Sequence, residues 1–216
     1  YVSLNDEISG IKRLLICTMD TFGNTCPIDQ TDLDGQLVVD AAHSFGTRAL
    51  GQRGLIECGS FAATKNVHGG EGGFILTKDK QLYEAMRKVR DFAGRMPELS
   101  CALALTYIQE CMDDIQKLKV EIDTYYRKHL KEVTWQHLGD TSRCSIGMLV
   151  EGRDKWIQTF DPVTTAATRN GVEVRLVYST PLAPGLPNTD YIAKRIVVLP
   201  SWPGVDYEEV VRRLTT

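Results

Sequence analysis

Two residues stand where an α/β protein could place its chemistry. Asp40 directly follows residues 37–39 (LVV), a continuous apolar run typical of a strand buried on both faces of a parallel sheet. Lys65 follows the strand-like segment GSFAAT and precedes the glycine-rich segment NVHGGEGG. Ligands of open α/β sheets bind outside the carboxyl ends of the strands, so both side chains could reach one crevice. Taken singly, each has a plainer interpretation: Asp40 as a helix cap and Lys65 as a solvated loop amine.

A carboxylate and an amine at one crevice indicate pyridoxal phosphate chemistry. This cofactor needs a lysine to form the Schiff base and a carboxylate to keep its pyridine nitrogen protonated, so that the ring acts as an electron sink. Ser60, five residues before Lys65, could donate its hydroxyl to the phosphate, or could bond locally at a strand end. Gly59 leaves room for close backbone approach. His43, three residues after Asp40, could lie against the ring, although a structural histidine is an equally good interpretation.

The other histidines and the cysteines predict no metal site. His68, His129 and His137 lack metal-ligand spacing, and we interpret them as structural. The six cysteines include no C-x-x-C pair, so the sequence predicts neither a zinc site nor a redox dithiol. We expect reduced packing residues at all six positions, which are Cys17, Cys26, Cys58, Cys101, Cys111 and Cys144.

Short buried strands must position these side chains. The hydrophobic pattern predicts strands at residues 11–17, 37–39, 59–64 and 72–79. An amphipathic helix is expected over residues 80–92, with Asp79 as its N-cap, and a longer helix is expected from after Pro97 to about Leu130. A sheet followed by a long exit helix suggests a first domain over residues 1–130.

The remainder of the sequence predicts a smaller α+β domain over residues 131–216. Its expected elements are a strand at 144–150, a helix at 154–170 ended by Asn170 and Gly171, strands at 172–178 and 196–200, and a terminal helix capped by Asp206.

The composition of the chain is that of a globular protein. The 216 residues carry 25 Lys and Arg against 28 Asp and Glu, and 43% of them are hydrophobic. A net charge of −3 offers no electrostatic footprint for nucleic acid. No apolar run approaches the ~20 residues that cross a bilayer, and the N-terminus lacks the pattern of a secretion signal. We therefore expect a cytoplasmic protein without a nucleic-acid or membrane partner.

Three blocks in order resemble one known family. VVDAAHSFG, then GSFAATKNVHGGEGGFILTKD, then RMPELSCALAL are similar to the DegT/DnrJ/StrS family of sugar aminotransferases, which have the aspartate aminotransferase fold (fold type I). The resemblance continues more weakly through EVRLVYSTPL and IVVLPSWPGVDYEEV. It implies an α/β fold, with an incomplete large-domain sheet of the PLP-dependent transferase type, a long connecting helix and a smaller C-terminal domain.

The resemblance also implies roles for five residues of this chain. Asp40 would pair with the pyridinium nitrogen of pyridoxal phosphate, and His43 would touch the cofactor. Ser60 would bind the phosphate, and Lys65 would hold the cofactor covalently. Arg95 would contact the phosphate in the active site of a neighbouring subunit, since the family forms homodimers.

The sequence departs from the family in two places. Family members carry a long N-terminal part, with a phosphate-binding turn and an aromatic residue that stacks on the ring, and nothing upstream of Ile11 matches it. The connection from Asp91 to Arg95 also looks short. We therefore expect a chain shortened at its N-terminus relative to the family.

The implied activity is the transfer of an amino group from an amino acid such as glutamate to a nucleotide-linked keto sugar. Family dehydratases carry a histidine in place of the lysine, so Lys65 favours amine transfer. Two alternatives stay open: a cofactor-binding or regulatory protein or fragment without turnover, and a structural domain in which Asp40 and Lys65 merely pair.

Overall fold

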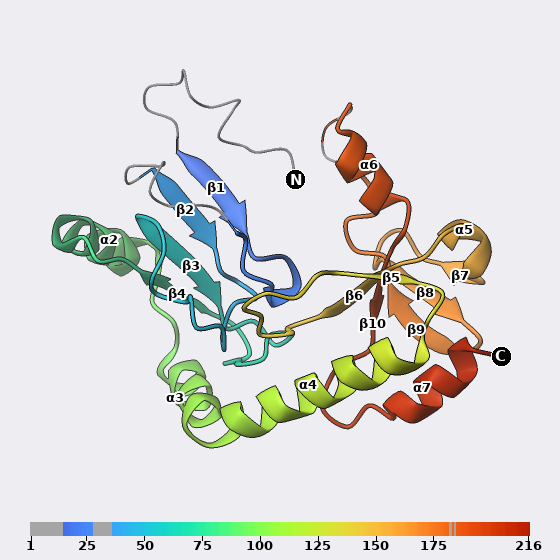
Figure 1. Ribbon diagram of the computed structural model, residues 1–216. Coiled ribbons are helices and arrows are strands. Elements are labelled where there is room, and N and C mark those ends of the chain that lie inside the picture. The colour runs from blue at the N-terminus through green and yellow to red at the C-terminus, as the bar shows by residue number, and fades with distance from the viewer. Residues whose placement is uncertain (1–14, 28–35, 182, 184) are drawn as a thin grey trace. The chain divides into compact units, whose positions relative to one another are not determined.

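Two separate sheets organise the chain (Figure 1). The computed structural model describes residues 15–27, 36–181, 183 and 185–216. The predicted strand at 11–17 lies largely outside the described residues, as does the stretch upstream of Ile11. Contacts divide the chain into two compact units: a first unit that runs to Asp113 and includes Gly139–Cys144, and a second unit that holds Asp114–Leu138 and Ser145–Thr216.

The first unit contains a four-stranded sheet in the order β1-β2-β3-β4. Strands β1 (Ile16–Met19), β2 (Leu37–Asp40) and β3 (Ile56–Ser60) are parallel, and β4 (Gly73–Leu76) runs antiparallel to β3. In β2, the side chains of Leu37 and Val39 are buried in the core of the sheet, whereas Val38 on the other face is only partly buried. Since β1, β2 and β3 are parallel, their carboxyl ends share one edge.

The strand predicted at residues 59–64 is wrong in its bounds, because the chain leaves the sheet after Ser60. Backbone hydrogen bonds from the Phe61 amide to the Gly72 carbonyl and from the Gly69 amide to the Phe61 carbonyl close the loop that follows. At Gly59 a Cβ atom would lie 2.0 Å from the Phe74 ring on the adjacent strand, so only glycine fits there.

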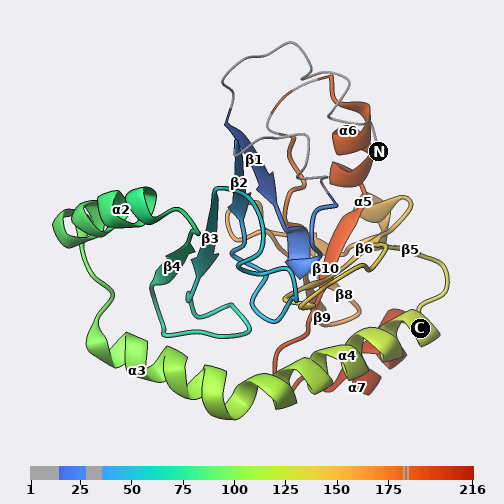
Figure 2. The same ribbon diagram turned by 60° about the vertical axis from the view of Figure 1, so that its left-hand side comes forward.

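The predicted helices of the first half are present. Helix α2 (Lys80–Ala93) begins at Asp79, whose carboxylate accepts a hydrogen bond of 2.9 Å from the Leu82 amide. Figure 2 shows α2 beyond the β4 edge of the sheet. Helix α3 (Glu98–Thr106), a π-helical turn (Tyr107–Cys111) and α4 (Met112–His129) follow one another, as the helix expected after Pro97. In the described ranges, no helix combines the length and the apolar character that crossing a membrane requires.

The division into units differs from the division expected at residue 130. It falls inside α4, between Asp113 and Asp114, so that most of this helix belongs to the second unit. The short segment Gly139–Cys144 returns to the first unit, where its hydrogen bonds lie. Sequence pattern alone gives no signal for such a return.

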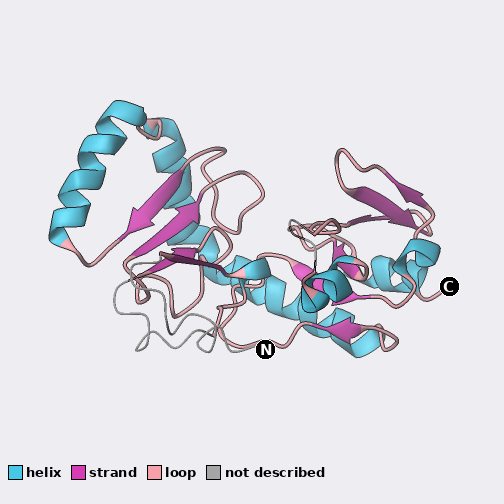
Figure 3. Cartoon of the chain, turned by 90° about the horizontal axis from the view of Figure 1, so that it is seen from above, coloured by secondary structure: helices cyan, strands magenta, loops and turns pink. Residues whose placement is uncertain are grey.

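The second unit contains a six-stranded sheet in the order β5-β6-β10-β9-β8-β7. Figure 3 shows the strands and helices of the chain by colour. The core of the second unit includes Ile122 and Tyr126 of α4 and Met148, Val174 and Val197 of the sheet. The strands are β5 (Thr134–Trp135), β6 (Ile146–Leu149), β7 (Thr159–Phe160), β8 (Ala166–Arg169), β9 (Val172–Arg175) and β10 (Ile196–Leu199), and the further helices are α5 (Arg153–Trp156), α6 (Pro187–Ala193) and α7 (Tyr207–Leu214).

The helix predicted over residues 154–170 is wrong. Only α5 is helical there, and β7 and β8 occupy the rest. Asn170 and Gly171 have φ angles of 49° and 74°, which suit the two-residue turn that joins β8 to β9. The Asn-Gly pair is thus a hairpin turn, and not the end of a helix. The predicted terminal helix α7 is confirmed, since the Asp206 carboxylate accepts a hydrogen bond from the Glu209 amide.

Candidate functional site

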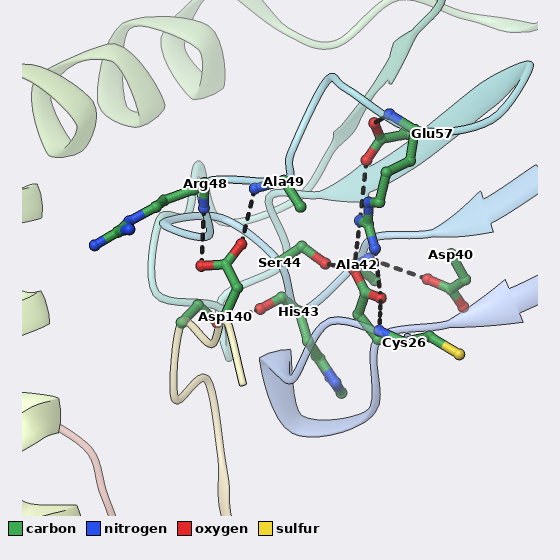
Figure 4. A network of polar contacts seen from close by, with 12 residues as sticks. Cys26, Asp40, Ala42, His43, Ser44, Arg48, Ala49, Glu57 and Asp140 are labelled. Atoms are coloured by element: carbon green, nitrogen blue, oxygen red, sulfur yellow. Dashed lines mark hydrogen bonds and ion pairs between the residues drawn. The ribbon is translucent and has the colours of Figure 1, made fainter. Parts of the chain in front are cut away.

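The candidate site begins at the shared carboxyl edge of the parallel strands. Asp40 is the last residue of β2, and in register it faces Cys58 of β3, two residues before Ser60. One oxygen of the Asp40 carboxylate accepts a hydrogen bond of 3.0 Å from the Ala42 amide, which turns the chain away from the sheet (Figure 4). The carboxylate is only partly buried. Asp40 is therefore held at the strand end with room to bind another group.

Ser60 and Lys65 lie at the end of β3 and in the turn beyond it. The Ser60 hydroxyl accepts a hydrogen bond of 3.2 Å from the Ala62 amide, and the Lys65 amide donates to the Ala62 carbonyl at 3.0 Å. The partly buried Lys65 amine has no hydrogen-bond or ion-pair partner in the described part of the chain. Next to it, Asn66 is buried and donates through Nδ2 to the Ser142 carbonyl at 2.9 Å, which anchors the turn.

His43 links these two strand ends electrostatically. Its burial and the positive charge of Lys65 together lower its pKa to about 4, against the opposing effect of the Asp40 and Asp20 carboxylates. The ring nitrogen Nδ1 accepts a hydrogen bond of 3.2 Å from the Phe22 amide. His43 is therefore a neutral imidazole at physiological pH, within electrostatic range of both Asp40 and Lys65.

A buried ionic network supports the loop that carries His43 (Figure 4). Asp20, which follows β1, accepts two hydrogen bonds from the Arg53 guanidinium, at 2.9 and 2.6 Å, and one from the Ser44 hydroxyl. Arg53 also donates to Glu57 at 3.1 Å. The Asp20 side chain is 0% exposed and the Glu57 side chain 1%. Burial alone would raise the pKa of Asp20, but the hydrogen bonds from Arg53, Ser44 and the Cys26 amide outweigh it and lower that pKa.

The segment Gly139–Cys144 ties three loops of the site together. The Asp140 carboxylate accepts hydrogen bonds from the backbone amides of Arg48 and Ala49, at 3.1 and 2.8 Å. The Ser142 hydroxyl donates to the His43 carbonyl, and the Ser142 amide donates to the Gly23 carbonyl at 2.9 Å. This segment therefore fixes the loops after β1, β2 and β3 relative to one another.

Arg95 is not joined to the other predicted site residues. It lies just beyond α2, where its guanidinium donates to the Asp91 carboxylate at 3.0 Å and its side chain is 68% exposed. No contact within the described residues connects it to Asp40, His43 or Lys65.

The cysteines of the site region are free thiols. Burial raises the pKa of Cys58, and the neighbouring Asp40 carboxylate raises it further. Burial likewise raises the pKa of Cys26, with a further contribution from Asp20. These thiols stay protonated at neutral pH, so they pack and are not nucleophiles. No group of His, Cys, Asp and Glu among the described residues could hold a metal ion.

The arrangement fits the residues that pyridoxal phosphate needs. An unpartnered amine on Lys65 and a partly exposed carboxylate on Asp40 both act on one neutral imidazole. A hydroxyl on Ser60 stands between them in sequence at the adjacent strand end. The fold and these residue types together are those that a PLP-dependent enzyme of the α/β type would need at one sheet edge.

The comparison with protein families agrees with this class. Residues 12–215 match the model of the DegT/DnrJ/EryC1/StrS aminotransferase family, and the chain belongs to that family. The predicted family is therefore confirmed. Among curated relatives, the chain is similar to dTDP-4-amino-4,6-dideoxy-D-glucose transaminase of Shigella dysenteriae, with 28% identity over 116 residues that cover 46% of this chain and 31% of the relative.

Solved structures confirm the predicted fold class. An aminotransferase of the same family from Brucella abortus matches with a TM-score of 0.74 at 20% identity, over 92% of this chain and 63% of that chain. DesI, solved in the presence of its TDP-sugar product, matches with a TM-score of 0.74 at 21% identity, over 98% and 64%. NtdA of Bacillus subtilis, solved with bound PMP, matches with a TM-score of 0.77 at 17% identity, over 94% and 56%. The chain thus spans less than two thirds of the length of these three structures.

Sequence reasoning missed the ionic network and the segment that ties the loops. Asp20 could have been singled out from the sequence, since it lies at the carboxyl end of a strand, as Asp40 does. Arg53 and Glu57 had no such signal, because a charged residue in a loop or a short strand is normally expected to face solvent. Ser142 had none either, since its bond to His43 joins residues 99 positions apart.

Proposed function

We propose that this chain is the cofactor-binding part of a PLP-dependent sugar aminotransferase, and that it transfers an amino group from an amino acid, most simply glutamate, to a nucleotide-linked keto sugar. The observation that carries the proposal is the free amine of Lys65 near Asp40 and His43 at one edge of a parallel sheet, in a chain of this family. The Shigella relative is named as a transaminase of a dTDP-linked amino sugar, which supports the substrate class.

Each predicted site residue takes a role that its surroundings allow. When bound, the cofactor supplies a ring that stabilises negative charge on the carbon next to the amine. The Lys65 Nζ atom would hold the cofactor, and once displaced it would accept the proton from the substrate's alpha carbon and deliver it to the cofactor carbon that had carried the aldehyde. Asp40 places a negative charge beside the ring nitrogen, and its hydrogen bond from Ala42 fixes the direction of the carboxylate. Ser60 donates its hydroxyl to the phosphate.

Arg95 is proposed to act outside its own chain. Its guanidinium is exposed, and among the described residues it pairs with Asp91 alone, a surface pair that is weak. Arg95 is therefore available to contact the phosphate of a cofactor bound to a second copy of the chain. This is the reason to propose a homodimer. Six free cysteines agree with a reducing compartment, and we propose a cytoplasmic enzyme of amino-sugar and polysaccharide biosynthesis.

The test is spectroscopic and needs no sugar substrate. Pyridoxal phosphate added to the purified chain should give the visible absorbance of the lysine-bound cofactor, and glutamate should bleach it as the amino group moves. Lys65→Arg keeps the positive charge and should abolish the absorbance, whereas Lys78→Arg on the exposed surface should leave it intact. Colour that glutamate does not bleach would favour a binding protein without turnover, and no colour would reject the proposal.

A further inference from the structure

His43 receives a hydrogen bond that restricts its proton to one nitrogen. The bond comes from the Phe22 backbone amide, which can only donate, so His43 Nδ1 must be the acceptor and must carry no proton. A neutral imidazole has one proton, which therefore sits on Nε2. The main chain of the turn after β1 thus determines which ring nitrogen of His43 can donate.

The turn that supplies this amide has an unusual backbone. Residues Thr21–Gly23 form a 3₁₀ turn in which Phe22 has φ 61° and ψ 16°. The left-handed region is unfavourable for a bulky residue, and such residues persist only where their surroundings hold them in place. Here the Phe22 side chain is buried, and the preceding Asp20 is held by Arg53, Ser44 and the Cys26 amide.

Gly23 shows how closely the turn packs on the His43 loop. Its φ of +86° is a conformation that favours glycine. A Cβ atom at Gly23 would lie 2.0 Å from the Ser142 hydroxyl and 2.7 Å from the His43 carbonyl oxygen. The turn and the backbone of His43 are therefore in direct contact, and a side chain on Gly23 would push them apart.

We propose that the turn from Asp20 to Gly23 is a positioning device that fixes His43 as an Nε2–H donor. The inference rests on the proposed function and adds a role for His43, whose Nε2–H would donate to the oxygen substituent of the bound cofactor ring. Asp20, Phe22 and Gly23 are positioning residues, since they would act on the cofactor only through His43. His43 is the residue that would contact the cofactor, and its tautomer is already set in the cofactor-free chain.

A fixed neutral donor suits a site that also holds charged groups. Three charged residues act on His43: Asp20 from the end of β1, Asp40 from the end of β2 and Lys65 from the turn after β3. A protonated His43 would lose the Phe22 hydrogen bond and would repel Lys65. Burial and Lys65 keep the pKa of His43 near 4, so above about pH 5 the ring stays neutral, with Nε2 as the donor and Nδ1 as the acceptor.

The direct test is the tautomer of His43 in the cofactor-free chain. Histidine labelled with ¹⁵N gives separate NMR signals for protonated and unprotonated ring nitrogens, and His43→Gln assigns the His43 signals among the four histidines. We expect a protonated Nε2, an unprotonated Nδ1 and no titration between pH 5 and 8. A protonated Nδ1, or a titration near the ordinary pKa of 6.5, would overturn the inference.

A matched pair of glycine variants tests whether the turn is the cause. Gly23→Ala should displace the turn, mix the two tautomers and raise the pKa of His43 toward 6.5. Gly51→Ala carries the same backbone penalty, since Gly51 has φ +80°, but its Cβ would meet only Leu76 Cδ1 at an ordinary 3.6 Å. The Gly51 variant should keep the wild-type His43 spectrum, and equal spectra for the two variants would reject the turn as the cause.

The wild-type spectrum keeps the inference testable if Gly23→Ala fails to fold. The inference and the proposed function also fail separately. An Nε2–H tautomer in a chain that gives no colour with pyridoxal phosphate would leave the positioning role of the turn in place and reject the cofactor-facing role of His43. Colour together with an Nδ1–H tautomer would reject the positioning role alone.

Discussion

Arg53 is the residue whose removal should most weaken the first unit. Its guanidinium forms ion pairs with two carboxylates, Asp20 and Glu57, which are 0% and 1% exposed. Arg53→Met keeps the length of the aliphatic stem and leaves both carboxylates buried without a counter-charge. Removing one partner from a buried ion pair costs about 3–5 kcal/mol, a large part of the ~5–15 kcal/mol that stabilises a domain. We therefore expect Arg53→Met to lower the free energy of unfolding of the first unit by about 3–5 kcal/mol.

The assay must report on the first unit alone. All three tryptophans, at 135, 156 and 202, belong to the second unit, so their fluorescence follows the wrong part of the chain. Amide hydrogen exchange of the β2 residues, Leu37 to Asp40, measures the opening of the sheet next to the network. Arg95→Met is the control, because it breaks an exposed pair with Asp91 and should cost under about 1 kcal/mol. A loss in Arg53→Met no larger than that of the control would refute the reasoning.

The pH dependence of the same variant gives a second check. In the wild type the pKa of Asp20 is lowered, so its stabilising contribution is complete above the ordinary value of 3.8 and is lost as the pH falls below it. Without Arg53, burial raises the pKa of Asp20, and protonation of this carboxylate then removes part of the cost of its uncompensated charge. The stability difference between wild type and Arg53→Met should therefore shrink as the pH falls from 7 to 4.

Three further substitutions test separate parts of the account. Tyr126→Phe removes a buried hydroxyl that donates to the Pro200 carbonyl at 2.8 Å, and urea unfolding followed by tryptophan fluorescence should show a loss of about 1–3 kcal/mol; an unchanged midpoint would contradict it. Asp79→Ala removes the cap of α2 and should cost ~1 kcal/mol, read from exchange of the α2 amides against wild type. Asp40→Asn should still bind pyridoxal phosphate but bleach with glutamate at least tenfold more slowly; an unaltered rate would remove Asp40 from the site.

The candidate site residues and most of the main elements could be predicted from the sequence alone. Asp40 and Lys65 could be singled out because a strand end is where an α/β sheet binds ligands, and both lie where that rule predicts. The caps of α2 and α7 could be predicted because an aspartate before an amphipathic run satisfies free amides locally. These features depend on residues a few positions apart.

Features that depend on distant residues could not be predicted. The network of Asp20, Arg53 and Glu57 spans 37 positions, and its members are charged residues that a sequence reading assigns to the surface. The region 159–169 was misread because Asn170 and Gly171 suit both a helix end and a hairpin, and only pairing with β9 decides between them. Phe22 gave no sign of its left-handed backbone, because that conformation comes from tertiary contacts and not from its side chain.

The most direct measurement maps where pyridoxal phosphate attaches. Borohydride reduction of the purified chain after incubation with the cofactor would make the bond to lysine permanent, and peptide mass mapping would locate the pyridoxyl group. The account predicts a single modified residue, Lys65, and loss of the modification in Lys65→Arg. A pyridoxyl group spread over surface lysines, or its persistence elsewhere in that variant, would contradict the assignment of this site.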